Sequence, residues 1–305
     1  MPNEKQSERP SIRLMHDRYE YWKNIPYPGL VIDNKPAMTQ IDVTRVGDYF
    51  IYMSGDPLCA YSEDPVDLLA GRLEDPEVIG QNLFYKTVTG YWQGAKVTVC
   101  RGGPGGLLVA LALHDVMEYT ACSTFLRVGS AGGIDENAKI GDCIIASGIY
   151  RDDGTSRGFV PDGFPASCNY ELTAALVEAA NEQDIAYKLG VTACMDCDYT
   201  DNGRPSIGGY MQQAHIEKLG IYNRASVLCA DCDAAAMMTL CNLFGRRGGA
   251  IFHITDNVCT GDPFVTGAGM KESLELALGG IAALHRMDEE KRRAGKAIWY
   301  PALRK

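Results

Sequence analysis

The alternation of short apolar runs with longer helical patterns constrains the fold of this chain more than any other feature. Runs typical of strands, rich in apolar or β-branched residues, occupy 49–53, 97–100, 123–128, 143–147, 189–193, 225–228 and 250–254. Apolar residues recur with helical spacing over 107–117, 170–182, 234–244 and 271–284. Strands that alternate with helices predict an α/β fold, in which helices cover a central sheet.

The chain shows no Pro- or Ser-rich linker and no low-complexity tract, so its 305 residues predict one large domain. The prolines of residues 1–44 and their weak periodicity predict an irregular N-terminal arm. Residues 45–286 then form the folded domain. Residues 287–305 are rich in charge and predict a solvated C-terminal helix or tail.

The formal charge of −10 argues against a nucleic-acid partner, which requires a basic surface. A local pocket can still bind an anion against this overall charge. No run of eighteen apolar residues predicts a membrane span, and the polar N-terminus lacks the apolar core of a signal peptide. We therefore expect a cytoplasmic protein with no membrane partner.

Eleven cysteines in such a chain indicate reduced thiols, most of them buried. Two Cys-x-x-Cys pairs, Cys194 with Cys197 and Cys229 with Cys232, raise the alternative of a zinc module. The 31 residues between the pairs exceed the roughly 15–20 of a compact module. The five histidines show no metal-ligand spacing either. We therefore expect no metal site.

The segment 127–133, Arg-Val-Gly-Ser-Ala-Gly-Gly, follows a predicted buried strand. Its small residues would let the backbone bend so that successive amides face an anion. Ser130 adds a hydroxyl donor, and Arg127 adds a forked positive charge suited to phosphate. The alternative is a tight turn in which Arg127 pairs with a carboxylate. The spacing alone does not separate these two interpretations.

Segment 127–134, followed by 140–147, resembles the core signature of the nucleoside phosphorylases. This family includes uridine phosphorylases, purine nucleoside phosphorylases and methylthioadenosine-type nucleosidases. Further segments that agree in order are 55–57, 102–104, 190–193 and 231–236. Segments 164–166, 174–180 and 202–204 look nearest to uridine phosphorylases. The resemblance spans about residues 45 to 285, and it implies a single domain with a central mixed, partly barrel-like sheet flanked by helices.

The resemblance implies phosphorolysis, in which phosphate attacks the anomeric carbon and the free base leaves. The transition state of such a glycosyl transfer has oxocarbenium character. Inorganic phosphate would be the co-substrate, and no cofactor is implied. Gly55, Arg127 and Ser130 match phosphate-binding positions, with Gly129 in the same segment.

Asp231, Cys232 and Asp233 fall where the family has Glu-Met-Glu, whose last carboxylate binds the ribose hydroxyls. The resemblance therefore assigns sugar binding to Asp233, with Asp231 and Cys232 beside it. Because Asp is one methylene shorter than Glu, Asp233 would need a shifted backbone or ligand, or a bridging water. The alternative is that these acids cap the helix predicted over 234–244.

The signals for base recognition conflict. Asn202 and Arg204 match the Gln-x-Arg of uridine phosphorylases, which reads the uracil edge. Asp198 stands where the family has an aromatic residue that stacks on the base, with Tyr199 next to it. Asp256 instead matches the acid that protonates N7 of a purine, although an Asx turn at the end of a strand would also explain it.

The phosphate side departs from the family pattern. Cys59 replaces one phosphate-binding arginine, and the arginine that a neighbouring subunit lends falls near Leu83. The N-terminal histidine lent across that interface falls near residue 36 or 37. Arg101 or Lys86 could supply replacement charge. Each lost charge-assisted hydrogen bond would weaken phosphate binding by about 1.5–3 kcal/mol.

Our leading hypothesis is a nucleoside phosphorylase that prefers uridine, built as a homodimer or a larger homo-oligomer of dimers. A purine or broad-specificity phosphorylase is one alternative. A catalytically degenerate member that binds nucleosides is another.

Overall fold

The computed structural model describes residues 31–55 and 63–304. Most of the N-terminal arm lies outside these residues, as does Cys59. Within the described part of the arm, β1 (Val31–Ile32) and β2 (Lys35–Pro36) form a small antiparallel pair. None of the described helices is both long and apolar enough to cross a membrane.

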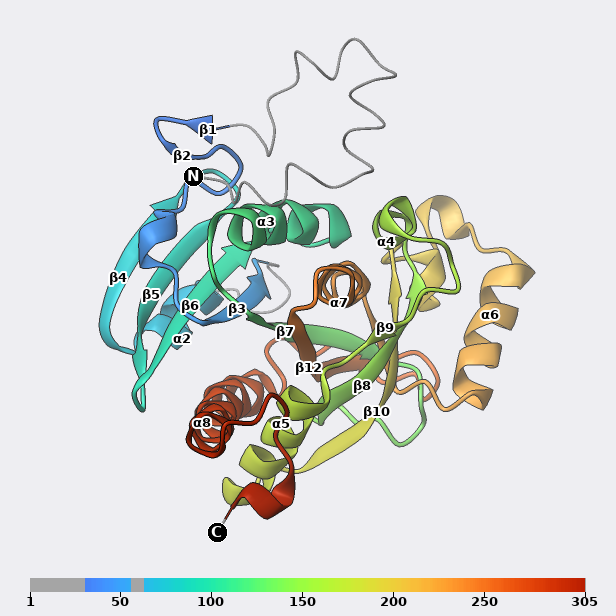
Figure 1. Ribbon diagram of the computed structural model, residues 1–305. Coiled ribbons are helices and arrows are strands. Elements are labelled where there is room, and N and C mark those ends of the chain that lie inside the picture. Colours follow the sequence, from blue (N-terminus) through green and yellow to red (C-terminus); the bar gives the residue numbers. More distant parts are fainter. Residues whose placement is uncertain (1–30, 56–62, 305) are drawn as a thin grey trace.

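One ten-stranded mixed sheet forms the centre of the molecule (Figure 1). Its strands are β3 (Tyr49–Ser54), β4 (Glu74–Gln81), β5 (Lys86–Trp92), β6 (Ala95–Gly102), β7 (Thr124–Gly133), β8 (Cys143–Asp152), β9 (Ala166–Ser167), β10 (Tyr187–Met195), β11 (Cys229–Asp231) and β12 (Arg247–Asn257). They run in the order β11-β10-β8-β12-β7-β3-β6-β5-β4, with β9 beside β8. Because β11 also pairs with β7, five strands close into a ring. The expected α/β domain with a partly barrel-like sheet is confirmed.

Helices cover the sheet on two sides. The described helices are α2 (Pro65–Ala70), α3 (Gly106–Tyr119), α4 (Gly154–Phe159), α5 (Tyr170–Glu182), α6 (Gln213–Arg224), α7 (Ala234–Leu243) and α8 (Met270–Ala294). Alternate side chains of one strand point to opposite sides of the sheet. Phe50 and Tyr52 of β3 therefore join a core with α3 and α7, while Ile51 and Met53 join a core with α5 and α8.

Six of the seven predicted strands and all four predicted helices are present. The strand predicted over 225–228 is wrong, because these residues form the exit from α6 instead. Ser226 has a positive φ of 59°, and the Val227 amide donates to the Tyr222 carbonyl. The strand starts only at Cys229. At the other end of the chain, α8 continues through Ala294, so the start of the charged C-terminal stretch is helical.

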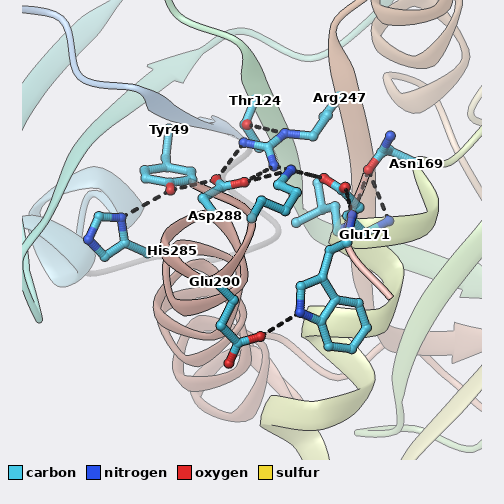
Figure 2. Close-up of polar contacts among 11 residues, drawn as sticks. Tyr49, Thr124, Asn169, Glu171, Arg247, His285, Asp288 and Glu290 are labelled. Atoms are coloured by element: carbon cyan, nitrogen blue, oxygen red, sulfur yellow. Dashed lines mark hydrogen bonds and ion pairs between the residues drawn. The ribbon is translucent and has the colours of Figure 1, made fainter. Parts of the chain in front are cut away.

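A partly buried polar network holds the last helix against the amino-terminal ends of the strands (Figure 2). Arg247, the first residue of β12, donates to both carboxylate oxygens of Asp288 at 2.7 and 2.8 Å. It also donates to Glu171 of α5 at 3.1 Å. Glu171 accepts further hydrogen bonds from Lys291 and from the backbone amide of Trp299. The network therefore holds β12, α5, α8 and the C-terminal segment together.

Asp288 makes part of the stability of this fold dependent on pH. Burial raises the pKa of Asp288, but the hydrogen bonds and charge of Arg247, with help from Lys291 and Tyr49, outweigh burial and lower this pKa to about 2. An acid with a depressed folded-state pKa stabilises the fold above its unfolded pKa of about 3.9 and loses that contribution toward its folded pKa.

We predict that Asp288→Asn lowers the free energy of unfolding at pH 7 by about 2 kcal/mol. The difference from the wild type should shrink as the pH falls from about 4 toward 2. Urea unfolding at several pH values measures both effects. Glu182→Gln is the control, because Glu182 pairs with Arg286 on the surface and its side chain is 55% exposed. An equal loss in both variants would contradict a special role for Asp288.

Candidate active site

The carboxyl ends of several strands meet at one pocket of about 520 Å³, a volume that includes its solvent-open part. Strands β3, β7 and β12 run parallel, so their carboxyl ends lie at the same edge of the sheet, where ligands bind in open α/β folds. The lining residues are Ser54, Pro104, Arg127, Ser130, Ala131, Gly132, Asp198, Asn202, Arg204, Ala230, Asp231, Cys232, Asp233, Thr255, Asp256 and Phe264.

Nine of the twelve site residues predicted from the sequence line this pocket. The other three, Gly55, Gly129 and Tyr199, are not among its lining residues. Gly55 lies directly after β3, with its amide bonded to the Gly102 carbonyl. Gly129 lies within β7, and the Tyr199 side chain is 58% exposed.

The turn predicted over 127–133 is wrong, because β7 continues as a strand through Gly133. Gly129 and Ser130 pair with Phe252 and His253 of β12, and Gly132 and Gly133 also pair with β11. The small residues have a packing role instead. A Cβ on Gly129 would lie 2.0 Å from Arg127 Nη1, so a side chain there would displace the guanidinium.

Arg127, one of the lining residues, is buried and ion-paired. Its Nη2 lies 2.5 Å from Asp233 Oδ2, its Nη1 donates to the Val128 carbonyl, and its Nε lies 3.9 Å from Asp231 Oδ2. We refer to Ser54, Arg127, Asp231 and Asp233 as the Arg127 cluster. The sequence alternative of Arg127 paired with a carboxylate is therefore realised, although on a strand and not in a tight turn.

Asp233 is fully buried and accepts hydrogen bonds from three elements. Ser54 Oγ donates to its Oδ2 at 2.5 Å, and the Gly105 amide donates to its Oδ1 at 2.6 Å. Ser54 belongs to β3, Arg127 to β7, and Gly105 directly precedes α3. Asp233 therefore connects these three elements to the start of α7. Asp233 stands at the N-cap of α7 but its side chain accepts no capping hydrogen bond.

Asp231 caps α7, a role that the sequence analysis considered for both Asp231 and Asp233. Its Oδ2 accepts from the amides of Asp233 at 3.1 Å and Ala234 at 3.0 Å. Its Oδ1 is buried and has no hydrogen-bond partner among the described residues. Burial raises the pKa of Asp231 above its ordinary range; the charge of Arg127 opposes this shift and that of Asp233 adds to it.

A second group of lining residues is organised around Arg204. Its Nη1 donates to the carbonyl and to Oδ1 of Asp198 at 2.9 and 3.0 Å, and its Nη2 donates to Asp256 Oδ2 at 2.5 Å. Asn202 Nδ2 also donates to Asp198 Oδ1, at 3.1 Å. We refer to Asp198, Asn202, Arg204 and Asp256 as the Arg204 cluster. In this cluster Arg204, which with Asn202 matches the uridine phosphorylases, binds Asp256, which matches the purine phosphorylases.

Asp256 does not form the Asx turn considered as its alternative. It lies within β12, where Thr255 Oγ donates to its Oδ1 at 3.1 Å. The neighbouring Asn257 forms that turn, because its Oδ1 accepts from the amides of Cys259 and Thr260.

Sequence reasoning missed Ser54, Gly105 and Phe264. Ser54 directly follows the strand predicted over 49–53 and Gly105 follows the segment 102–104, so both positions carried a weak signal. Phe264 lies in a segment without regular structure, and no local pattern marks it. Phe264 contributes an aromatic side chain to the described lining, which does not include Tyr199.

Neither proposed replacement cation reaches the pocket lining. Arg101 Nε donates to Asp64 at 3.2 Å, and Lys86 Nζ donates to Asp67 at 2.6 Å. Leu83 lies in the turn between β4 and β5 with 85% of its surface exposed. In the described part of the chain, no group of three or more His, Cys, Asp or Glu side chains is arranged to hold a metal ion.

Comparison with known proteins identifies the family. Residues 53–284 match the family model described as the phosphorylase superfamily. A uridine phosphorylase of Thermococcus kodakarensis is 34% identical over 263 residues, which cover 86% of this chain and 90% of that protein. A uridine phosphorylase of Escherichia coli is 28% identical over 72% of this chain and 88% of its own length. A guanosine phosphorylase of Halorubrum lacusprofundi is 28% identical over 65% and 76%.

The family model covers most of the chain, including β7, β12 and every residue found in the pocket lining. The Thermococcus relative extends the similarity across nearly the full length of both proteins. The chain belongs to the phosphorylase superfamily.

Proposed function

We propose that this protein is a nucleoside phosphorylase that cleaves the N-glycosidic bond of uridine with inorganic phosphate. The products would be uracil and ribose 1-phosphate. Family membership and the relatives named uridine phosphorylase support this activity. The arrangement of the pocket supports it as well, because cationic, hydroxyl and carboxylate groups suited to phosphate, sugar and base line one cavity.

In the proposed reaction, a phosphate oxygen forms a bond to the anomeric carbon while the bond from that carbon to the base breaks. The electron pair of the broken bond leaves with the base. Groups that stabilise this developing negative charge accelerate the step. The Arg204 guanidinium is placed to do so for a uracil ring, and Asn202 can bind a polar edge of the same ring.

The observation that carries the preference for uridine is the ion pair of Arg204 with Asp256 at 2.5 Å. Asp256 Oδ2 accepts from Arg204 and its Oδ1 accepts from Thr255, so both of its oxygens already serve as acceptors, whereas a general acid must present a proton to N7 of a purine. We therefore assign Asp256 the role of positioning Arg204. The guanosine phosphorylase among the relatives keeps purine cleavage as the second candidate.

At the Arg127 cluster, phosphate would compete with Asp233 for the guanidinium. We propose that Arg127 and Ser130 bind phosphate and that Asp231 and Asp233, with Cys232, bind the sugar. Because Arg127 already compensates a carboxylate, phosphate affinity should be modest. No cofactor is part of this proposal.

We further propose a homodimer or a larger assembly of dimers in the cytoplasm. The exposed Leu83 and Phe84 offer an apolar contact at the turn between β4 and β5. Free thiols at all ten described cysteines suit a reducing compartment. Light scattering of the purified protein measures the oligomeric state.

Uridine phosphorolysis tests the main proposal. Ribose 1-phosphate and uracil should appear together, and only when phosphate is present. Cleavage without phosphate would assign a hydrolase instead. Nucleoside binding by calorimetry without turnover, even at high phosphate, would assign a catalytically degenerate member.

Substitution of Arg127 should weaken the use of phosphate. We predict that Arg127→Ala lowers kcat/KM for phosphate roughly tenfold to a hundredfold, because a charge-assisted hydrogen bond is lost. Arg127→Lys keeps a cation beside Asp233 and serves as the variant that preserves the buried charge balance. Lys86→Ala is the control, since Lys86 pairs with Asp67 outside the pocket lining. Unchanged phosphate kinetics in both Arg127 variants would refute the placement of phosphate.

A comparison of uridine with inosine separates the two roles of Asp256. We predict that Asp256→Asn and Arg204→Ala each lower kcat/KM for uridine about tenfold or more. The double variant should lose little beyond Arg204→Ala, because residues that act as one unit are not additive. If Asp256→Asn abolishes inosine cleavage and leaves uridine cleavage intact, Asp256 is the acid of a purine phosphorylase.

A further inference from the structure

We propose that a second pocket, at the end of the strands opposite to the candidate active site, binds a ligand through its phosphate groups. None of the described residues that line this second pocket lines the candidate active site, so its ligand is additional to the proposed substrates. The position of the pocket, the cations in its lining and the N–H donors that its internal hydrogen bonds leave over all point to such a ligand.

The second pocket lies where β3, β7 and β12 begin, and we refer to it as the strand-start pocket. Tyr49 is the first residue of β3, Ser123 directly precedes β7, and Arg247 is the first residue of β12. Tyr49 and Arg247 both pair with Thr124 in the sheet, so the three strand starts lie side by side. Helix α8 contributes further lining residues. The pocket has a volume of about 920 Å³, which includes its solvent-open part, so it has room for more than one phosphate group.

The lining of the strand-start pocket is rich in cations, although the formal charge of the chain is −10. Its carboxylates are Asp48 and Asp288, whereas its cationic side chains are Arg247, Lys291, Arg292 and Lys296. Arg292 pairs with Glu289 on the surface, and exposed ion pairs of this kind contribute little. Lys296 has no ion-pair partner among the described residues. A pocket of this composition can attract an anion against the overall charge of the protein.

The polar network of Figure 2 leaves two N–H donors over in this lining. The Arg247 guanidinium donates from Nε to Thr124, from Nη1 to Glu171 and Asp288, and once from Nη2 to Asp288. Because a guanidinium has five N–H groups, one at Nη2 has no acceptor among the described residues. Lys291 Nζ uses two of its three N–H groups, toward Glu171 at 2.6 Å and Asp288 at 2.9 Å. Phosphate oxygens can accept from both residues while the carboxylates stay bound.

The stability of α8 explains only part of this group of cations. Basic side chains near the C-terminus of a helix offset its partial negative charge, which accounts for Arg292 and its neighbours in the last turn. Lys296 lies beyond that turn. Gly295 has a positive φ of 63°, and the Lys296 amide donates to the Lys291 carbonyl at 3.0 Å, as in a Schellman motif. This reversal of the chain returns Lys296 to the lining, so Lys296 is the residue that most specifically marks an anion site.

Asp48 opposes an anion in the same pocket and allows a test in the opposite direction. It is exposed, and it forms no ion pair with the described residues. Removal of its charge should therefore strengthen the binding of a phosphate group, whereas removal of Lys296 should weaken it. A general effect of net charge would not depend on whether the changed residue lines the pocket.

Calorimetry with inorganic pyrophosphate on the full-length protein tests the inference. We expect Lys296→Ala to weaken the binding of pyrophosphate about threefold to fivefold at low salt, and Asp48→Asn to strengthen it about twofold. Both effects should shrink at high salt. Arg293→Ala is the matched control, because it removes the same charge three residues earlier, at a position outside the lining. Absence of binding, or equal effects of Lys296→Ala and Arg293→Ala, would overturn the inference.

A variant of the candidate active site separates the two pockets. Arg127→Ala should leave a pyrophosphate site that still responds to Lys296→Ala, since Arg127 is not in the strand-start lining. Loss of all pyrophosphate binding in Arg127→Ala would place the ligand in the candidate active site and overturn the inference. Uridine 5′-diphosphate then identifies the source of the phosphate groups. Equal affinity for both ligands supports an inorganic polyphosphate, and tighter binding of the nucleotide that Lys296→Ala also weakens supports a nucleotide.

Discussion

The buried ion pair between Arg127 and Asp233 is the interaction on which the pocket depends. It joins β7 to the start of α7, and through Ser54 and the Gly105 amide it also holds the end of β3 and the entry to α3. Removing one partner of such a pair leaves a buried charge without compensation, which typically costs about 3–5 kcal/mol. Arg127 is the group best suited to bind phosphate, and it also holds these elements together. Phosphate binding and stability therefore depend on the same side chain.

The elements that were predicted correctly are those whose own composition requires burial. Strand β3 and helix α5 follow apolar patterns that match their burial, and both were found at or close to their predicted bounds. Strand β4 was not predicted, because its first residues, Glu74 to Glu77, are charged, contain a proline and are mostly exposed. Strand β4 is stabilised by its pairing with β5, and the local sequence pattern of β4 does not reveal that pairing.

In the candidate site, the sequence predicted which residues line the pocket but not which hydrogen bonds they form. Motif spacing brought together the side chains that line the pocket, because the ends of neighbouring parallel strands meet at one edge. It did not reveal that Asp231 caps α7 while Asp233 accepts three hydrogen bonds, since both acids suit either role. It also could not find Phe264, whose place in the lining depends on tertiary packing.

The position of Asp256 illustrates how a small irregularity of the sheet shapes the chemistry of the pocket. The register of β12 against β7 pairs Ile254 with Ala131 but Asp256 with Gly132, so Thr255 is an extra residue. A bulge of this kind turns the following side chain to the other face of the strand. Asp256 therefore lies against Gly132, where a Cβ would be 3.5 Å from Asp256 Oδ1 and 3.9 Å from Arg204 Nη2. Without the extra residue, Asp256 would point toward the opposite face, and Asp198 alone would remain of the two carboxylates that bind Arg204.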